Sequence, residues 1–241
     1  MPIEAARVWP LPWGGWLALD AAGTLRSYDE GGRPTAYHWS DRRLGAPDAV
    51  DASQPLRVVL FFRDWQQVVW LDRTLTVVGS LSFAEAGWTD VAAVAAAPDK
   101  GLWCYLPWQR RLVLVGADGR LRREGPPLDL VLAKVPRRVR WLQRHEGRLF
   151  LAAAEAVYVF DDFGQYVTRL DFPKGASEVQ VVGPWLVCRQ AGSIVWQHLN
   201  DPLRRRTMPL PETEGLRQMW WQAGRLYLLG QRGVTVWELA E

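Results

Sequence analysis

The chain has 241 residues, of which 49% are apolar and 12% aromatic, and its formal net charge is +3. This apolar content excludes an intrinsically disordered chain, and no stretch approaches the roughly 20 apolar residues that a transmembrane helix needs. The small net charge also lacks the basic footprint of a dedicated nucleic-acid-binding protein.

Short apolar runs recur along the chain at intervals of about 40 residues. Each contains three to five residues rich in Leu, Val and aromatic side chains, which is typical of a β-strand. In chain order these runs are 17–19, 58–61, 102–105, 149–151, 186–188 and 226–229. A second run of the same kind follows each first one after a short turn, at 25–28, 68–71, 112–115, 157–160, 194–196 and 234–237.

Two further strands complete each repeat, one before the first run and one after the second. Asp-Gly and Gly-Gly pairs, which suit tight hairpin turns, lead into the last strand of several repeats. Four strands per unit, repeated six times, predict an all-β fold: a single six-bladed β-propeller domain with four-stranded antiparallel blades. A β-sandwich would not repeat one four-stranded unit in this way. We expect blades at approximately 7–39, 48–83, 90–128, 137–173, 177–211 and 216–239.

The sixth repeat offers three strands before the sequence stops. We expect residues 1–6 to close this blade with a short edge strand, or the natural chain to begin further upstream. The first residues lack the basic segment and apolar stretch of a secretion signal, so the sequence as given favours the cytoplasm. A missing upstream leader would instead place the protein in the periplasm or outside the cell.

The segment 55–72 carries a more specific pattern, Pro-Leu-Arg-Val-Val-Leu-Phe-Phe-Arg-Asp-Trp-Gln followed by a Leu-Asp turn. It resembles a group of bacterial six-bladed β-propeller proteins, mainly from Bacteroidota-type lineages. The stretch 157–164, Val-Tyr-Val-Phe-Asp-Asp-Phe-Gly, is similar to NHL-type and TolB-like blade repeats. The resemblance implies the propeller fold and often an exported protein, but it implies no particular reaction.

Tryptophan is unusually frequent, with 15 Trp against seven Phe and six Tyr. Six of them recur near equivalent first or third strands, where a wide ring can fill the gap between twisted blades: Trp9, Trp70, Trp141, Trp196, Trp220 and Trp237. Trp65 and Trp108 instead fall in equivalent turns of the second and third repeats. Because exposed Trp beside Arg is the composition of an interaction hot spot, these two are the candidates for binding.

The turns between the second and third strands of all blades lie on one face of a propeller. In the second and third repeats these turns supply our binding-face candidates, namely Arg63, Asp64, Trp65, Gln66, Trp108, Gln109, Arg110 and Arg111. We therefore favour a non-enzymatic scaffold, monomeric, that presents this face to a protein or peptide partner. Ordinary solvated turns remain the simpler interpretation of the same residues.

An alternative is a small-ligand-binding, hydrolytic or lyase propeller with carboxylates at the mouth of its channel. Asp20, Asp64 and Glu155 are the candidates, since paired carboxylates can perform acid–base chemistry. No nucleophile elbow or phosphate-binding motif is present, and the three His fall in different repeats. We expect neither a metal site nor a cofactor.

A second alternative is weak binding of nucleic acid or another polyanion through Arg clusters. Arg42–Arg43, Arg110–Arg111, Arg120–Arg123, Arg137–Arg140 and Arg204–Arg206 are local basic runs in different repeats. Because these runs are expected to be scattered over the solvent-exposed surface and not gathered on one face, nucleic acid is not the expected partner. The two cysteines, Cys104 and Cys188, sit in apolar runs and are expected to be inert core thiols.

Overall fold

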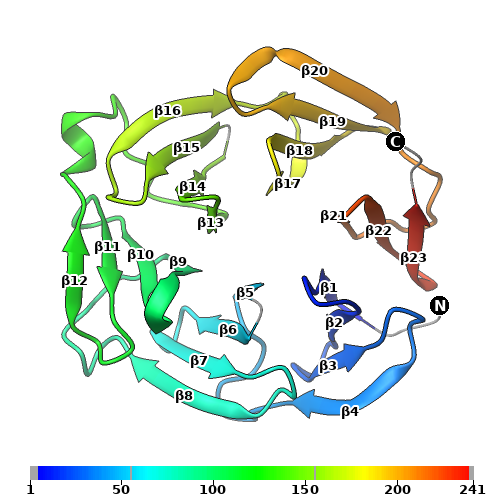
Figure 1. Ribbon diagram of the computed structural model, residues 1–241, viewed down its shortest axis with the longest axis horizontal. Coiled ribbons are helices and arrows are strands. Elements are labelled where there is room, and N and C mark those ends of the chain that lie inside the picture. The colour runs from blue at the N-terminus through cyan, green and yellow to red at the C-terminus, as the bar shows by residue number, and fades with distance from the viewer. Residues whose placement is uncertain (1–4, 55, 155, 239–241) are drawn as a thin grey trace. The chain divides into compact units, whose positions relative to one another are not determined.

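The computed structural model describes residues 5–54, 56–154 and 156–238, and almost all of their regular structure is antiparallel β-sheet. Five four-stranded sheets and one three-stranded sheet follow one another along the chain, each formed by consecutive strands (Figure 1). These sheets are the blades of a six-bladed β-propeller, which confirms the predicted fold class.

The chain divides into two compact units. The first contains residues up to Ala46, Arg73–Thr76 and the chain from Pro173 onward. Blade one consists of β1 (Arg7–Pro10), β2 (Trp16–Leu19), β3 (Leu25–Tyr28) and β4 (Pro34–Trp39). Blade five consists of β17 (Ser177–Val182), β18 (Trp185–Gln190), β19 (Ser193–His198) and β20 (Asp201–Pro209). Blade six has three strands among the described residues, β21 (Gln218–Gln222), β22 (Arg225–Gly230) and β23 (Gly233–Glu238).

The second unit contains Pro47–Asp72 and Val77–Phe172. Blade two consists of β5 (Ala49–Gln54), β6 (Arg57–Phe62), β7 (Gln67–Leu71) and β8 (Val77–Ser82). Blade three consists of β9 (Ala93–Ala96), β10 (Leu102–Leu106), β11 (Arg111–Val115) and β12 (Leu121–Glu124). Blade four consists of β13 (Trp141–His145), β14 (Arg148–Ala152), β15 (Ala156–Asp161) and β16 (Tyr166–Asp171). Two short 3₁₀ turns, Pro98–Lys100 and Leu128–Leu130, also belong to this unit.

The core of the second unit lies between its blades, and the alternation of side chains along β10 shows how. Leu102 and Cys104 pack with blade two, among Val59, Phe61 and Trp70. Trp103 and Tyr105, which point to the opposite side of the strand, pack with residues of blade four such as Leu142 and Tyr158. Every residue of β10 is therefore buried, and a continuous apolar run is needed to form it.

Aspartates shape several of the tight turns between strands. Asp161 Oδ1 accepts hydrogen bonds from the backbone N–H groups of Phe163 (2.8 Å) and Gln165 (2.9 Å) after β15. Such a side chain replaces backbone partners in the turn and favours it over other conformations. Asp161 thus has a turn-forming role.

The first strands of neighbouring blades contact one another within each unit: β5 with β9 and β9 with β13 in the second, and β17 with β21 and β21 with β1 in the first. A glutamine side chain joins β21 to β1. Gln218 Oε1 accepts a hydrogen bond from Val8 N (2.7 Å), and its Nε2 donates to Val8 O (2.8 Å). The side-chain amide thereby acts as a short piece of β-ladder between blades.

The predicted closure of blade six by residues 1–6 falls mainly on residues 1–4, which lie outside the described residues. Ala6 N donates a hydrogen bond to Leu19 O (2.7 Å), so this residue extends the pairing of blade one. Ala5 is buried in a cluster that joins Val8 and Trp16 of blade one to Tyr227 of blade six.

Two of the six expected packing tryptophans are buried, and three more, Trp141, Trp196 and Trp220, are half-buried. Trp9 and Trp70 are buried, and Trp196 makes an edge contact with Trp221 at 5.4 Å between ring centroids. Trp237 is the exception, since 42% of it is exposed, and the expectation that it fills a gap between blades is wrong. Trp237 lies on β23, which is an edge strand because blade six has no fourth strand among the described residues.

Both cysteines are free and buried, as expected. Burial raises the pKa of the Cys188 thiol to about 11, although the positive charge of Arg205 acts in the opposite direction. Burial also raises the pKa of Cys104. In the described ranges, no helix combines the length and apolar character required to cross a membrane.

Candidate functional site

A pocket of ≈ 480 Å³ opens within the second unit, among loops of blades two, three and four. The turn from β6 to β7 contributes Arg63 and Gln66, and the equivalent turn from β10 to β11 contributes Pro107 and Trp108. The segments that enter blades three and four provide the rest, so the lining residues are Arg63, Gln66, Asp90, Val91, Ala92, Pro107, Trp108, Arg137, Arg138 and Val139. The pocket thus forms where the second-to-third-strand turns meet the connections between blades.

An aspartate before each of two blades holds the turn that carries pocket residues. Asp48 Oδ2 accepts a hydrogen bond from Arg63 N (2.7 Å), and Asp90 Oδ2 accepts one from Trp108 N (3.0 Å). A carboxylate bound to a backbone N–H fixes the position at which the turn begins. Each turn is therefore held by one carboxylate, at its first residue in blade two and at its second residue in blade three. Trp108 is held at its backbone while its ring remains 80% exposed.

Gln66 joins its own turn to the segment that enters blade three. Its Nε2 donates to Arg63 O (2.7 Å) and Val91 O (3.0 Å), and its Oε1 accepts from Val91 N (2.7 Å). The pairing with Val91 has the same form as that of Gln218 with Val8 in the first unit. Gln66 consequently sets the distance between two walls of the pocket, which is a positioning role.

Tyr105 fixes the opposite wall. This residue of β10 is buried, and its hydroxyl donates a hydrogen bond to the carbonyl of Pro136, directly before Arg137 and Arg138. Burial raises the pKa of Tyr105, and the nearby charges of Tyr158 and Asp90 act in the same direction. The hydroxyl therefore keeps its proton, and the contact that anchors the Arg-bearing segment persists through the physiological pH range.

The pocket carries an excess of positive charge. Its lining holds three arginines and one carboxylate, that of Asp90. The guanidinium groups of Arg63, Arg137 and Arg138 form no ion pair or hydrogen bond with any described residue. Three guanidiniums without internal partners leave their donors available to an anionic ligand.

Three of the eight predicted binding-face residues line this pocket, namely Arg63, Gln66 and Trp108. Trp65 is 53% exposed, in the turn between Arg63 and Gln66. The remaining four, Asp64, Gln109, Arg110 and Arg111, do not line it. Arg110 pairs with Asp129 (2.6 Å) and Arg111 with Glu124 (2.5 Å), so the neighbouring acids already neutralise these two arginines.

Two of the three predicted channel-mouth carboxylates, Asp20 and Asp64, lie among the described residues. Asp20 Oδ1 accepts hydrogen bonds from the backbone N–H groups of Ala22 (2.9 Å) and Thr24 (2.8 Å), which is a turn-forming arrangement. Asp64 belongs to the other unit and is exposed, and Glu155 lies outside the described residues. Within the described ranges, no group of His, Cys, Asp and Glu side chains is arranged to hold a metal ion.

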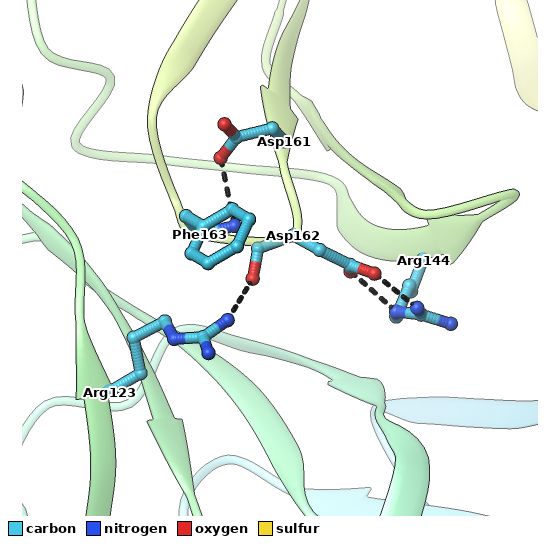
Figure 2. Close-up of polar contacts among 5 residues, drawn as sticks. All are labelled: Arg123, Arg144, Asp161, Asp162 and Phe163. Carbon is cyan, nitrogen blue, oxygen red and sulfur yellow. Dashed lines mark hydrogen bonds and ion pairs between the residues drawn. The ribbon is translucent and has the colours of Figure 1, made fainter.

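Other arginines of the second unit have structural partners, either in a neighbouring blade or within their own blade. Figure 2 shows Arg123 of β12 and Arg144 of β13 on either side of the turn after β15. Arg123 donates to Asp162 O (2.6 Å) with its guanidinium 4.5 Å from the centroid of the Phe163 ring, and Arg144 binds both carboxylate oxygens of Asp162. These contacts give the basic run 120–123 a structural role, in contrast to the unpaired arginines of the pocket.

Sequence reasoning missed Asp90, Val91, Ala92 and Val139 as pocket residues. The sequence showed Arg137 and Arg138 as part of a basic run, but it did not predict that they lie beside Trp108 in the pocket. Its placement next to Trp108 depends on the Tyr105–Pro136 contact, which joins residues 31 positions apart. An aspartate shortly before the first strand of blades two and three, Asp48 and Asp90, was the available signal.

Comparison with known proteins places the chain among β-propellers. A virginiamycin B lyase from Staphylococcus aureus is similar over 95% of this chain and 78% of that one, with 9% identity and a TM-score of 0.61. The Pan2 WD40 domain of Neurospora crassa is similar over 97% and 88%, with 12% identity and a TM-score of 0.60. PorZ, a surface component of the type-IX secretion system of Porphyromonas gingivalis, is similar over 100% of this chain but 37% of its own, with 16% identity and a TM-score of 0.57.

No family model matches the chain, and no curated protein matches it either. At identities between 9% and 16% the three structural likenesses show a shared fold. Propellers use one scaffold for many unrelated tasks, so function must be argued from the site.

Proposed function

We propose that the protein is a non-enzymatic binding module, which presents the loops of blades two to four to a protein or peptide segment. The observation that carries the proposal is the exposure of Trp65 and Trp108 in equivalent turns, at 53% and 80%, beside the arginine-lined pocket. Trp and Arg dominate the binding energy of protein interfaces. A ring that water reaches this freely contributes little to the fold, whereas covering it with a partner removes a large apolar area from water.

The proposal includes the finer predictions from the sequence: a protein or peptide partner, a monomeric chain, and membership of the bacterial propellers with NHL-like or TolB-like blades. The pattern in 55–72 supports the last of these, since it spans the turn that carries Arg63 and Trp65. The carboxylate alternative with Asp20, Asp64 and Glu155 remains a prediction that no contact between described residues favours.

Selection from a random peptide library tests the proposed function. Peptides selected on the wild-type protein should bind the W65A/W108A variant at least tenfold more weakly, because truncating a hot-spot residue costs about 2 kcal/mol or more. W237A is the matched control, since Trp237 is also exposed but lies in the first unit. Selected peptides that bind all three proteins equally would refute the proposal.

A further inference from the structure

We infer that the pocket of the second unit binds an acidic peptide segment, with a carboxylate side chain held by Arg63, Arg137 and Arg138. The inference rests on the proposed peptide-binding function and names its ligand chemistry. Four lines of evidence support it: unpaired charge, the arrangement of donors and acceptors, the fixed walls, and the size of the pocket.

The charge of the pocket is not neutralised from within the protein. Arg110, in the same turn as Trp108, and Arg111, the first residue of β11, are paired with acids at 2.6 and 2.5 Å. The three pocket arginines have no such partner among the described residues. Guanidinium groups bind carboxylates through two parallel hydrogen bonds, so an anionic side chain supplies the partner that the fold omits.

The donors and acceptors of the pocket match a peptide. Arginine can only donate hydrogen bonds, whereas the Asp90 carboxylate can only accept them. Asp90 Oδ2 already accepts from Trp108 N (3.0 Å), and a carboxylate has room for further donors. An acidic peptide offers both complements, a carboxylate for the arginines and a backbone N–H for Asp90. A nucleic-acid backbone supplies the anion but has no N–H group to donate to Asp90.

The walls of the pocket are fixed before a ligand arrives. Gln66 holds the segment at Val91 through two hydrogen bonds, and Tyr105 holds the segment at Pro136. Because the backbone on both sides is already ordered, binding loses less conformational entropy than it would with mobile loops.

The size and the apolar lining fit one or two residues of an extended chain. The volume of ≈ 480 Å³ lies within the range of small-ligand pockets. Val91, Ala92 and Val139 provide apolar contact, and the exposed ring of Trp108 can cover the stem of a bound side chain.

Fluorescence anisotropy with a defined probe tests the inference. The probe is a fluorescein-labelled peptide of four glutamates between Gly-Ser flanks, and its reference has glutamines in place of the glutamates. Wild-type protein should bind the glutamate peptide at least tenfold more tightly than the glutamine peptide. R137A/R138A should lose that preference, while R42A/R43A should keep it, because Arg42 and Arg43 are an exposed adjacent pair that does not line the pocket.

Several results would overturn the inference. These are equal binding of the two peptides, an equal loss in both double-arginine variants, or tighter binding of a single-stranded 20-nucleotide DNA that depends on Arg137 and Arg138. The last result would assign the pocket to nucleic acid. R63E gives an independent variant, which should also lose the glutamate preference if the pocket is used.

Failure of the acidic-peptide inference can be distinguished from failure of the proposed peptide-binding function. Library-selected peptides that need Trp65 and Trp108 but tolerate R137A/R138A would leave the binding module intact and remove only the acidic ligand. Peptides whose binding is unaffected by substitution of Trp65, Trp108, Arg137 and Arg138 would refute both the binding module and the acidic ligand.

Discussion

Trp65 and Trp108 differ from the packing tryptophans in how much of their rings water reaches. Trp103 lies in β10, five residues before Trp108, is 1% exposed and packs in the core between blades three and four. The same residue type therefore has two roles within six positions. Its role is decided by whether the residue lies in a strand or in the turn that follows.

Substitution of these residues should separate the two roles. W65A/W108A should change the free energy of unfolding by less than about 1 kcal/mol, because exposed side chains away from special features contribute little to stability. W103A should lower it by about 3–5 kcal/mol through loss of a fully buried ring. Chemical denaturation followed by circular dichroism measures both, and a large loss in W65A/W108A would make these rings part of the core.

Tyr105 is the residue on which the Arg137–Arg138 wall depends. Y105F keeps the buried ring but leaves the Pro136 carbonyl without its donor. We expect a loss of about 1–3 kcal/mol in the free energy of unfolding and weaker binding of the glutamate peptide. Y158F is the control for a general loss of stability, because Tyr158 of β15 lies in the same core cluster as Tyr105. A peptide affinity equal in Y105F and wild type would contradict the positioning role.

At the scale of elements, side-chain amides replace backbone pairing between blades. Gln66 and Gln218 each bind both backbone groups of one residue in a neighbouring blade. Blades have no continuous backbone ladder between them, so such contacts set how adjacent first strands and loops meet. This arrangement explains why a pocket wall can be rigid without being part of a sheet.

The amide of Gln66 can be tested against that of Gln109, which lies in the corresponding turn of blade three. Q66A should lower the free energy of unfolding by about 1–3 kcal/mol and speed hydrogen exchange at the Val91 amide. Q109A should do neither, since Gln109 is exposed and does not line the pocket. Unchanged exchange at Val91 in Q66A would show that the contact does not hold this segment.

The strands were predictable because their signal is local. A continuous apolar run such as 102–106 needs no distant information to indicate a buried strand, and the positions of Trp65 and Trp108 in turns follow from the repeat. The pocket was not predictable in the same way. Asp90 and Arg138 approach Trp108 through connections between blades, and their path is set by contacts such as Tyr105 with Pro136, over 31 positions of sequence.

At the scale of the whole molecule, the two thiols, Cys104 and Cys188, are buried in different units. With a pKa of about 11, Cys188 is ionised in roughly one molecule in a thousand at pH 8, whereas a free thiol with a pKa of about 8.5 is ionised in about a quarter. Native protein should therefore react slowly with a disulfide reagent at pH 8 and release two thiols in denaturant.

The same shift predicts the direction of a pH effect on stability. The pKa of Cys188 is raised in the folded state, so the unfolded chain loses this proton at a lower pH. The contribution is fully present below about pH 8.5 and decreases as the pH rises toward 11. Urea unfolding of wild type and C188A across this range should show a steeper alkaline decline for wild type; parallel curves would contradict the assignment.

The blades supply rigidity, and the loops of one unit supply the binding chemistry that we propose. Several arginines of that unit bind acids or carbonyls, either of a neighbouring blade, as Arg123 does, or of their own blade, as Arg144 does (Figure 2). Arg63, Arg137 and Arg138 are left available at the pocket. The central claim is therefore about location: a partner contacts the turns of Trp65 and Trp108 and not another exposed aromatic surface.

Fluorine NMR of protein labelled with 5-fluorotryptophan tests this claim most directly. The resonances of Trp65, Trp108 and Trp237 can be assigned from the W65F, W108F and W237F variants. On titration with the glutamate peptide, the Trp108 resonance should shift together with that of Trp65, and the Trp237 resonance should stay in place. A shift of Trp237 with Trp108 unmoved would contradict the account.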